Sequence, residues 1–111
     1  MNIAEQNIEN ANFYGYENQS HQLIEECAEL IQAVNKFRRA HRKGEKEGIE
    51  IAKDNLVEEI ADVELMLDQI KYMLNISEQS ILGMKHYKVH RTKENIWREK
   101  SELFNCSLDG E

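Results

Sequence analysis

The sequence contains no proline, and none of its apolar runs approaches the ~18 residues that a membrane-spanning helix requires. Proline breaks the interior of a helix, so its absence favours long, continuous helices. The first six residues have neither the basic start nor the apolar core of a secretory signal. We therefore expect a cytoplasmic protein without a membrane partner.

Cysteine and histidine are also scarce, with two and four residues respectively. Cys27 falls on the apolar side of a predicted helix, and Cys106 lies far from it near the C-terminus. This arrangement argues against a disulfide framework and against a zinc site. No histidine follows a glutamate by three positions, which excludes the Glu-x-x-His pairs of a di-iron carboxylate bundle.

Positive charge is in deficit. Asp and Glu total 21 against 14 Lys and Arg, which gives a formal net charge of −7. This balance argues against a nucleic-acid polymer as the partner. A small phosphate ligand stays compatible with it, because a bound metal ion can reverse the local field. The length of 111 residues fits a single domain, residues 1–111, with a modest core.

Apolar residues at steps of three and four predict an all-α helical bundle of three main helices, residues 17–43, 48–74 and 77–100. A short N-terminal arm or frayed helix, residues 1–16, precedes them, with a turn at 14–16. A flexible tail is expected at residues 105–111. The apolar arc of the central helix consists of Leu56, Ile60, Val63, Leu67, Ile70 and Leu74.

Carboxylates border the apolar arcs of the first two helices. Glu59 and Asp62 align with Met66 on the margin where a neighbouring helix should pack, and Glu26 and Glu29 form a similar pair. Charges at an apolar margin are costly unless something compensates them. Solvation or pairing with Lys or Arg is one solution. The other is antiparallel packing around one hard cation, Mg²⁺ or Mn²⁺, which prefers oxygen ligands.

These residues carry a resemblance. Glu25-Glu26-x-x-Glu29 followed by Glu59-x-x-Asp62 resembles the EExxE…ExxD signature of the MazG-like, all-α nucleoside triphosphate pyrophosphohydrolases. The likeness spans residues 14–96 and includes Gly15 and Gln19 before the first motif. The stretch between the motifs is slightly long for the family, which we assign to a longer connection.

The resemblance implies Mg²⁺-dependent hydrolysis of a nucleoside triphosphate to the monophosphate and pyrophosphate. It implies Glu26, Glu29, Glu59 and Asp62 as metal ligands. Glu25 and Glu26 are the carboxylates expected to act in catalysis. It also implies a homodimer or homotetramer, in which two subunits complete a four-helix core. The residues expected to bind substrate are Gln22, Lys36, Lys85, Lys88 and Arg91.

Alternatives stay open at this point. Tyr14 or Tyr16 either stacks on a base or packs at a helix entry. Lys36 and the basic side of the third helix either bind phosphate or are simply solvated. Phosphoribosyl-ATP is a second substrate that the resemblance permits. A non-catalytic helical protein that binds a nucleotide or another protein is the alternative outside the enzymes.

Overall fold

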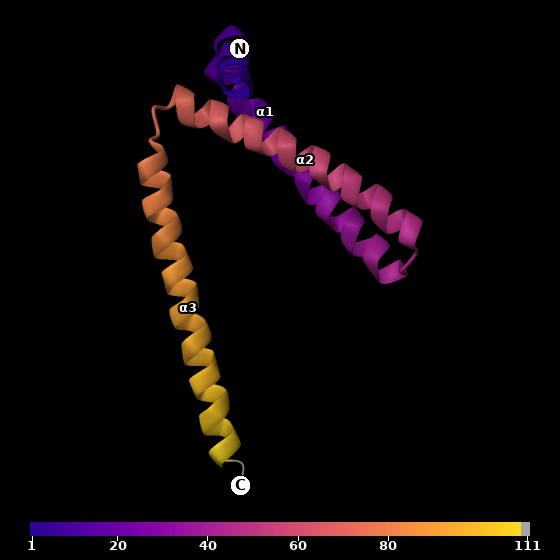
Figure 1. Ribbon diagram of the computed structural model, residues 1–111, viewed down its shortest axis with the longest axis vertical. Coiled ribbons are helices and arrows are strands. Elements are labelled where there is room, and N and C mark those ends of the chain that lie inside the picture. The colour runs from indigo at the N-terminus through magenta and orange to yellow at the C-terminus, as the bar shows by residue number, and fades with distance from the viewer. Residues whose placement is uncertain (110–111) are drawn as a thin grey trace. The chain divides into compact units, whose positions relative to one another are not determined.

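The computed structural model describes residues 1–109, with side chains described as far as residue 106. It contains three helices: α1, Ile3–Lys43; α2, Lys46–Met73; and α3, Glu78–Asp109 (Figure 1). No strand occurs among residues 1–109, which confirms the all-α prediction. None of the described helices is long and apolar enough to cross a membrane.

Both ends of the chain are more helical than the sequence predicted. The first turn of α1 is held by a capping box, in which the Glu5 amide donates to Asn2 Oδ1 at 2.8 Å. Capping of this kind satisfies amides that a helix start leaves without partners, so the predicted arm is a true helical segment. At the other end, α3 includes residues 105–109 of the predicted tail, whereas residues 110–111 lie outside the described part.

Gly15 interrupts α1. Its φ of 84° and ψ of 167° are non-helical and lie in a region that essentially only glycine occupies. Before this break, Asn7 contacts Leu65 and Asn12 contacts Tyr72, so the segment runs in the same direction as α2. After the break, Gln19 contacts Gln69, and α1 runs antiparallel to α2 up to its cap at Gly44. Two segments of α1 therefore pack on one helix.

The described chain forms two compact units, Met1–Asn75 and Ile76–Glu111. The first unit holds α1 and α2, and the second holds α3. The buried apolar side chains of the first unit are few and mostly small: Ala11, Ala33, Val63 and Met66. Such a core leaves much apolar surface on the two helices uncovered within one chain.

A chain of carboxamides runs through the first unit. Gln19 Nε2 donates to Gln69 Oε1 at 2.8 Å, and Gln69 Nε2 donates to Asn7 Oδ1 at 2.7 Å. Asn7 Nδ2 then donates to the Leu65 carbonyl at 3.0 Å. All three side chains are buried, so these bonds replace water that the amides have lost. The carboxamide chain thus fixes both segments of α1 on α2.

We expect Gln69→Leu to destabilise the protein by about 2 kcal/mol or more, because it leaves buried groups of Gln19 and Asn7 without partners. Urea denaturation measures the change. Gln32→Leu, at an exposed position of α1, is the control and should be nearly neutral. Equal stability of the Gln69 variant and the parent would show that the carboxamide chain does not hold the segments together.

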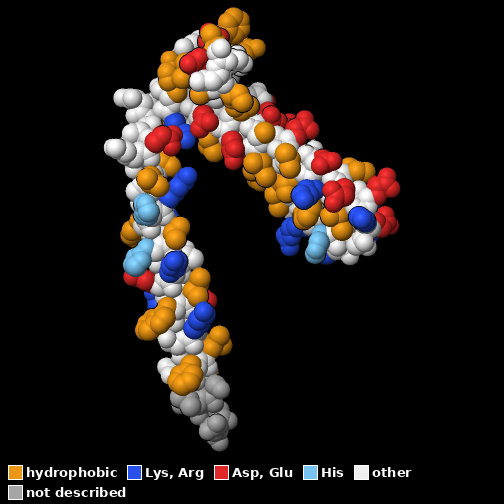
Figure 2. Space-filling model, viewed as in Figure 1, with side chains coloured by type: hydrophobic (Ala, Val, Ile, Leu, Met, Phe, Trp, Pro, Cys, Tyr) orange, Lys and Arg blue, Asp and Glu red, His pale blue; other side chains and the backbone are white. Residues whose placement is uncertain are grey.

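The apolar arc predicted for α2 is only partly buried in one chain. Val63 is buried, but Ile60, Leu67 and Leu74 are exposed. The reason is that α1 packs against the neighbouring stripe of α2, which contains Met66 and Gln69. Figure 2 shows apolar side chains exposed along α1 and α2.

Candidate metal centre

Four carboxylates from two helices converge in the first unit. We call Glu26 and Glu29 of α1 with Glu59 and Asp62 of α2 the carboxylate cluster. One carboxylate oxygen from each residue lies within 4.8 Å of the others. The convergence follows from the sequence spacing, because residues i and i+3 share a helix face and the two helices pack with these faces together.

The cluster is partly withdrawn from water. Glu26, Glu59 and Asp62 are half-buried, and Glu29 is exposed. Glu26 Oε2 and Glu59 Oε2 are buried and have no hydrogen-bond partner among the described residues. A buried carboxylate oxygen without a partner is costly, so these two atoms are candidates to bind a cation.

Within the first unit, no Lys or Arg side chain pairs with the cluster. In the part of the chain that the structure describes, none of its four carboxylates forms an ion pair with a basic side chain. Pairing with a Lys or Arg of α1 or α2 therefore has no support, and pairing with the basic residues of α3 is untested. What remains is a site made of anionic oxygen donors, half-buried and open at Glu29, which is the donor set that suits Mg²⁺ or Mn²⁺.

The pKa of Asp62 is raised by its position in the cluster. Its partial burial, and then the charge of the Glu26 carboxylate and a hydrogen bond with it, raise the pKa of Asp62 above its ordinary value. Burial and a like charge both disfavour the ionised form. A divalent cation bound between the helices would act in the opposite direction and favour ionised carboxylates.

Gln22 lies beside the cluster, one turn before Glu26. Its Nε2 donates to Glu26 Oε1 at 2.8 Å. The sequence predicted that Gln22 binds substrate, but the contact found in the structure is to a carboxylate. That bond fixes one oxygen of Glu26 and leaves Oε2 facing the other acidic groups without a partner. Gln22 is thus placed to orient Glu26, as outer hydrogen bonds orient the ligands in many metal sites.

Glu25 is not part of the cluster. Its Oε1 lies 3.2 Å from His21 Nε2, on an exposed side of α1. Adjacent helical residues point about 100° apart, so Glu25 turns away from the direction that Glu26 takes. A direct role for Glu25 at the cluster has no support in this geometry, although its predicted part in catalysis stays a prediction.

The predicted basic residues fall in two places. Lys36 is exposed on α1, seven residues and about 10 Å of helix beyond Glu29. Lys85, Lys88 and Arg91 are exposed on α3, in the second unit. The Arg91 guanidinium lies 5.7 Å from the centre of the Tyr87 ring. Phosphate binding by these four residues stays a prediction.

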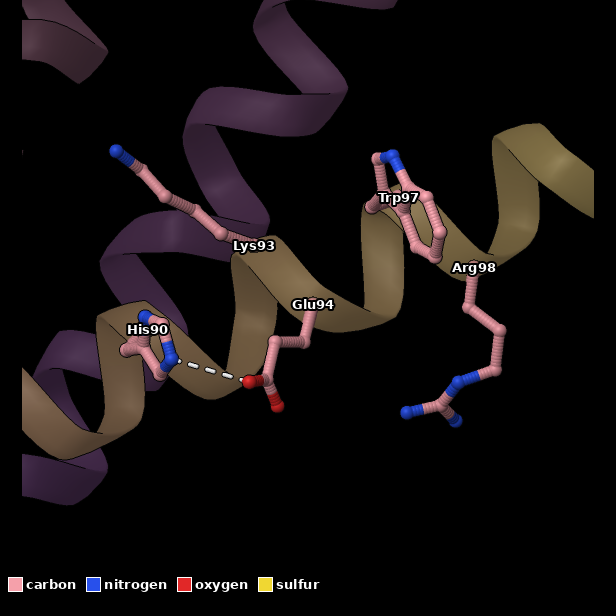
Figure 3. A pocket seen from close by; sticks show the side chains of 5 residues that line it. All are labelled: His90, Lys93, Glu94, Trp97 and Arg98. Atoms are coloured by element: carbon pink, nitrogen blue, oxygen red, sulfur yellow. Dashed lines mark ion pairs between the residues drawn. The ribbon is translucent and has the colours of Figure 1, made fainter.

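A hollow on α3 is the other feature of chemical interest (Figure 3). It measures about 510 Å³ and is lined by His90, Lys93, Glu94, Trp97 and Arg98. His90 Nε2 lies 3.0 Å from Glu94 Oε1. All five residues come from successive turns of one helix, so no second element converges on the hollow. A binding pocket normally draws polar groups from several directions, which favours the carboxylate cluster as the functional site.

Sequence reasoning missed Asn7 and Gln69, which hold the helices in register beside the cluster. A signal was available for Gln69, because it belongs to the same stripe of α2 as Asp62 and Met66. Asn7 gave no such signal, since its segment was expected to be irregular.

No protein-family model matches the chain, and neither a curated protein nor a solved structure matches it.

Proposed function

We propose that the protein is a Mg²⁺-dependent nucleoside triphosphate pyrophosphohydrolase. The observation that supports this best is the carboxylate cluster, which has two buried oxygens without partners among the described residues and no ion pair with a basic side chain of α1 or α2. The order of its residues, Glu26 and Glu29 and then Glu59 and Asp62, is that of the MazG-like signature. Residue identity and three-dimensional placement thus support the same reaction class.

In this proposal the four carboxylates hold Mg²⁺, with Mn²⁺ as a substitute. When bound, the cation supplies charge neutralisation of the phosphate chain and lowers the pKa of a coordinated water. The protein contributes by holding the ligands. Gln22 restrains Glu26, while the carboxamide chain of Asn7, Gln19 and Gln69 fixes the spacing of the two helices that carry them.

The reaction transfers the α-phosphoryl group to water. The water oxygen forms a bond to the α-phosphorus, and the bond from that phosphorus to the bridging α–β oxygen breaks. The electron pair leaves with pyrophosphate, and the nucleoside monophosphate retains the new oxygen. Glu26 is better placed than Glu25 to accept the proton from the water, because it belongs to the cluster. Lys85, Lys88 and Arg91 are the proposed contacts of the departing phosphates.

The proposal includes a cytoplasmic location and assembly into a homodimer or homotetramer. The exposed apolar residues of α1 and α2 support assembly. They include Ile24 and Ile31 on α1, which are spaced by two turns, and Ile60 and Leu67 on α2, which have the same spacing. A surface of this kind on paired helices is typical of an interface, and a second copy would complete a four-helix core.

The direct test is release of pyrophosphate from a panel of ribo- and deoxynucleoside triphosphates and phosphoribosyl-ATP, with Mg²⁺ and with chelator. We expect release with Mg²⁺ only. If no nucleotide yields pyrophosphate under either condition, the proposed function is wrong, and a binding or regulatory role takes its place.

Metal binding is expected to depend on Glu29, although this residue is the most exposed of the cluster. Glu29→Gln should weaken Mg²⁺ or Mn²⁺ binding about tenfold or more, since even changes around metal ligands commonly have effects of this size. Calorimetric titration of the metal into the protein measures it. The matched control is Glu50→Gln, at an exposed position on the opposite side of α2. Equal metal affinity in all three proteins would remove Glu29 from the ligand set.

A further inference from the structure

A cleft opens where Gly15 interrupts α1. It measures about 500 Å³, within the usual range of small-molecule sites. Both helices of the first unit contribute to it. The residues that line it are Ala11, Asn12, Gly15, Tyr16, Tyr72, Met73 and Asn75.

Two unusual backbone positions shape this Gly15 cleft. Gly15 has a φ of 84°, and Asn75, just after α2, has a φ of 57°, the left-handed conformation in which asparagine can end a helix. Nothing lies within 4 Å of the place where a Gly15 side chain would begin, so the break leaves open space.

The lining is neutral and suited to a flat heteroaromatic ring. Tyr16 is 50% exposed and Tyr72 is 45% exposed, and they come from different helices. Tyrosine rings stack on nucleic-acid bases irrespective of base identity. None of the seven lining residues carries a charge, which makes the cleft unsuitable for a phosphate but suitable for a base.

Two carboxamides at the cleft are free to form hydrogen bonds. Tyr72 Oη donates to Asn12 Oδ1 at 3.1 Å, which fixes the orientation of Asn12. Asn12 Nδ2 and both polar atoms of the Asn75 side chain have no partner among the described residues. Carboxamides offer a donor and an acceptor side by side, the arrangement that reads the edge of a base.

The distance to the carboxylate cluster fits one nucleotide. Tyr16 lies ten residues before Glu26 on α1, and Tyr72 lies ten residues after Asp62 on α2, so each is about 15 Å of helix away. A nucleoside triphosphate in an extended conformation covers this distance from its base to its terminal phosphates. Gln22 and Met66 lie between the two sites along the helices.

We propose that the Gly15 cleft receives the base of the nucleotide whose phosphates lie at the carboxylate cluster, with Tyr16 stacking on it and Asn12 and Asn75 selecting it. This inference rests on the proposed function. Asn12 and Asn75 are then the specificity-determining residues, and Tyr16 contributes affinity for any base. They contact the substrate far from the bond that breaks, so their substitution should change KM more than kcat.

The test combines nucleoside binding with kinetics on the full chain. Uncharged deoxynucleosides, titrated without metal and followed by amide resonances, should shift Gly15 and Asn75, whereas pyrophosphate with Mg²⁺ should shift the cluster. Tyr16→Ala should raise KM about tenfold, the effect of losing one stacked base, and Tyr16→Phe should restore it. The matched control is Phe13→Ala, an exposed ring of α1 on the other side of Gly15 that does not line the cleft.

The outcomes separate the two proposals. If the parent releases pyrophosphate but nucleosides shift no cleft residue and Tyr16→Ala keeps the parental KM, the cleft assignment is overturned while the enzymatic function stands. If no nucleotide is hydrolysed, the proposed function fails, and the nucleoside titration decides the cleft alone. Binding at Gly15 and Asn75 that Tyr16→Ala weakens would support it, and resonances that do not move would overturn it.

Discussion

Asp62→Asn is expected to abolish pyrophosphate release and yet to leave the metal-free protein at least as stable as the parent. Asp62 lies among three other carboxylates and forms no ion pair with a basic side chain of the first unit. Without metal, its charge is unfavourable because of burial and the nearby Glu26. Asparagine has nearly the same shape without the charge, so the substitution relieves the folded state. With substrate and Mg²⁺ present, the same change removes a proposed ligand.

The stability of the metal-free protein should fall as the pH rises and Asp62 ionises. The pKa of Asp62 is raised in the folded chain relative to its ordinary value of 3.8, so the folded state binds this proton more tightly than the unfolded state. Protonation of Asp62 therefore contributes stability that is complete below pH 3.8. This contribution is lost as the pH rises through the higher pKa that Asp62 has in the folded chain. Asp62→Asn should reduce this loss in metal-free protein, and saturating Mg²⁺ should reverse it in the parent.

Thermal melts with chelator and with Mg²⁺ separate this expectation from a structural role. Removing one partner of a half-buried ion pair strands the other and destabilises the fold. A variant that melts well below the parent in chelator would therefore place Asp62 in the scaffold. The matched control is Asp68→Asn, on the same helix, where the exposed carboxylate lies 3.1 Å from Nζ of the half-buried Lys71. Such a pair contributes about 0–1 kcal/mol, and catalysis should not change.

The carboxylate pairs could be predicted from the sequence because they depend only on local helix geometry. Local spacing determines which side chains share a helix face, so Glu26 with Glu29 and Glu59 with Asp62 had to form stripes once both segments were helical. The absence of proline and the apolar periodicity predicted those helices. Local spacing does not determine which stripes of the two helices face each other. The structure brings the two carboxylate pairs together.

The sequence was less informative wherever packing depends on distant partners. Gly15 was expected to mark a turn before the first long helix, but the capped segment before it is helical and packs on α2. Polar side chains such as Asn7, Gln19 and Gln69 are normally expected at the surface. Their mutual hydrogen bonds explain why they are buried here. The six-residue apolar arc of α2 was expected to be the core of the bundle. Within the first unit, three of its six residues, Ile60, Leu67 and Leu74, are exposed.

That uncovered arc leads to the second large effect. Leu67→Glu is expected to dissociate the proposed oligomer, raising its dissociation constant 100-fold or more. Leu67 is 43% exposed in the single chain, so a glutamate there is tolerated by an isolated subunit. In a four-helix core shared by two subunits, the same residue would be a buried charge without a partner, which is strongly unfavourable.

The measurement is the molar mass in solution across a dilution series, by light scattering or sedimentation. Ile51→Glu is the control, because Ile51 is 64% exposed and lies on roughly the opposite side of α2. The parent and the Ile51 variant should share one assembly state, with the Leu67 variant smaller than both and still helical by circular dichroism. A parent that stays monomeric at all concentrations would contradict the proposed assembly, and an unchanged Leu67 variant would move the interface away from this arc. Since the arc borders the stripe that carries Glu59 and Asp62, loss of assembly should also reduce metal affinity, which connects the proposed interface to the proposed chemistry.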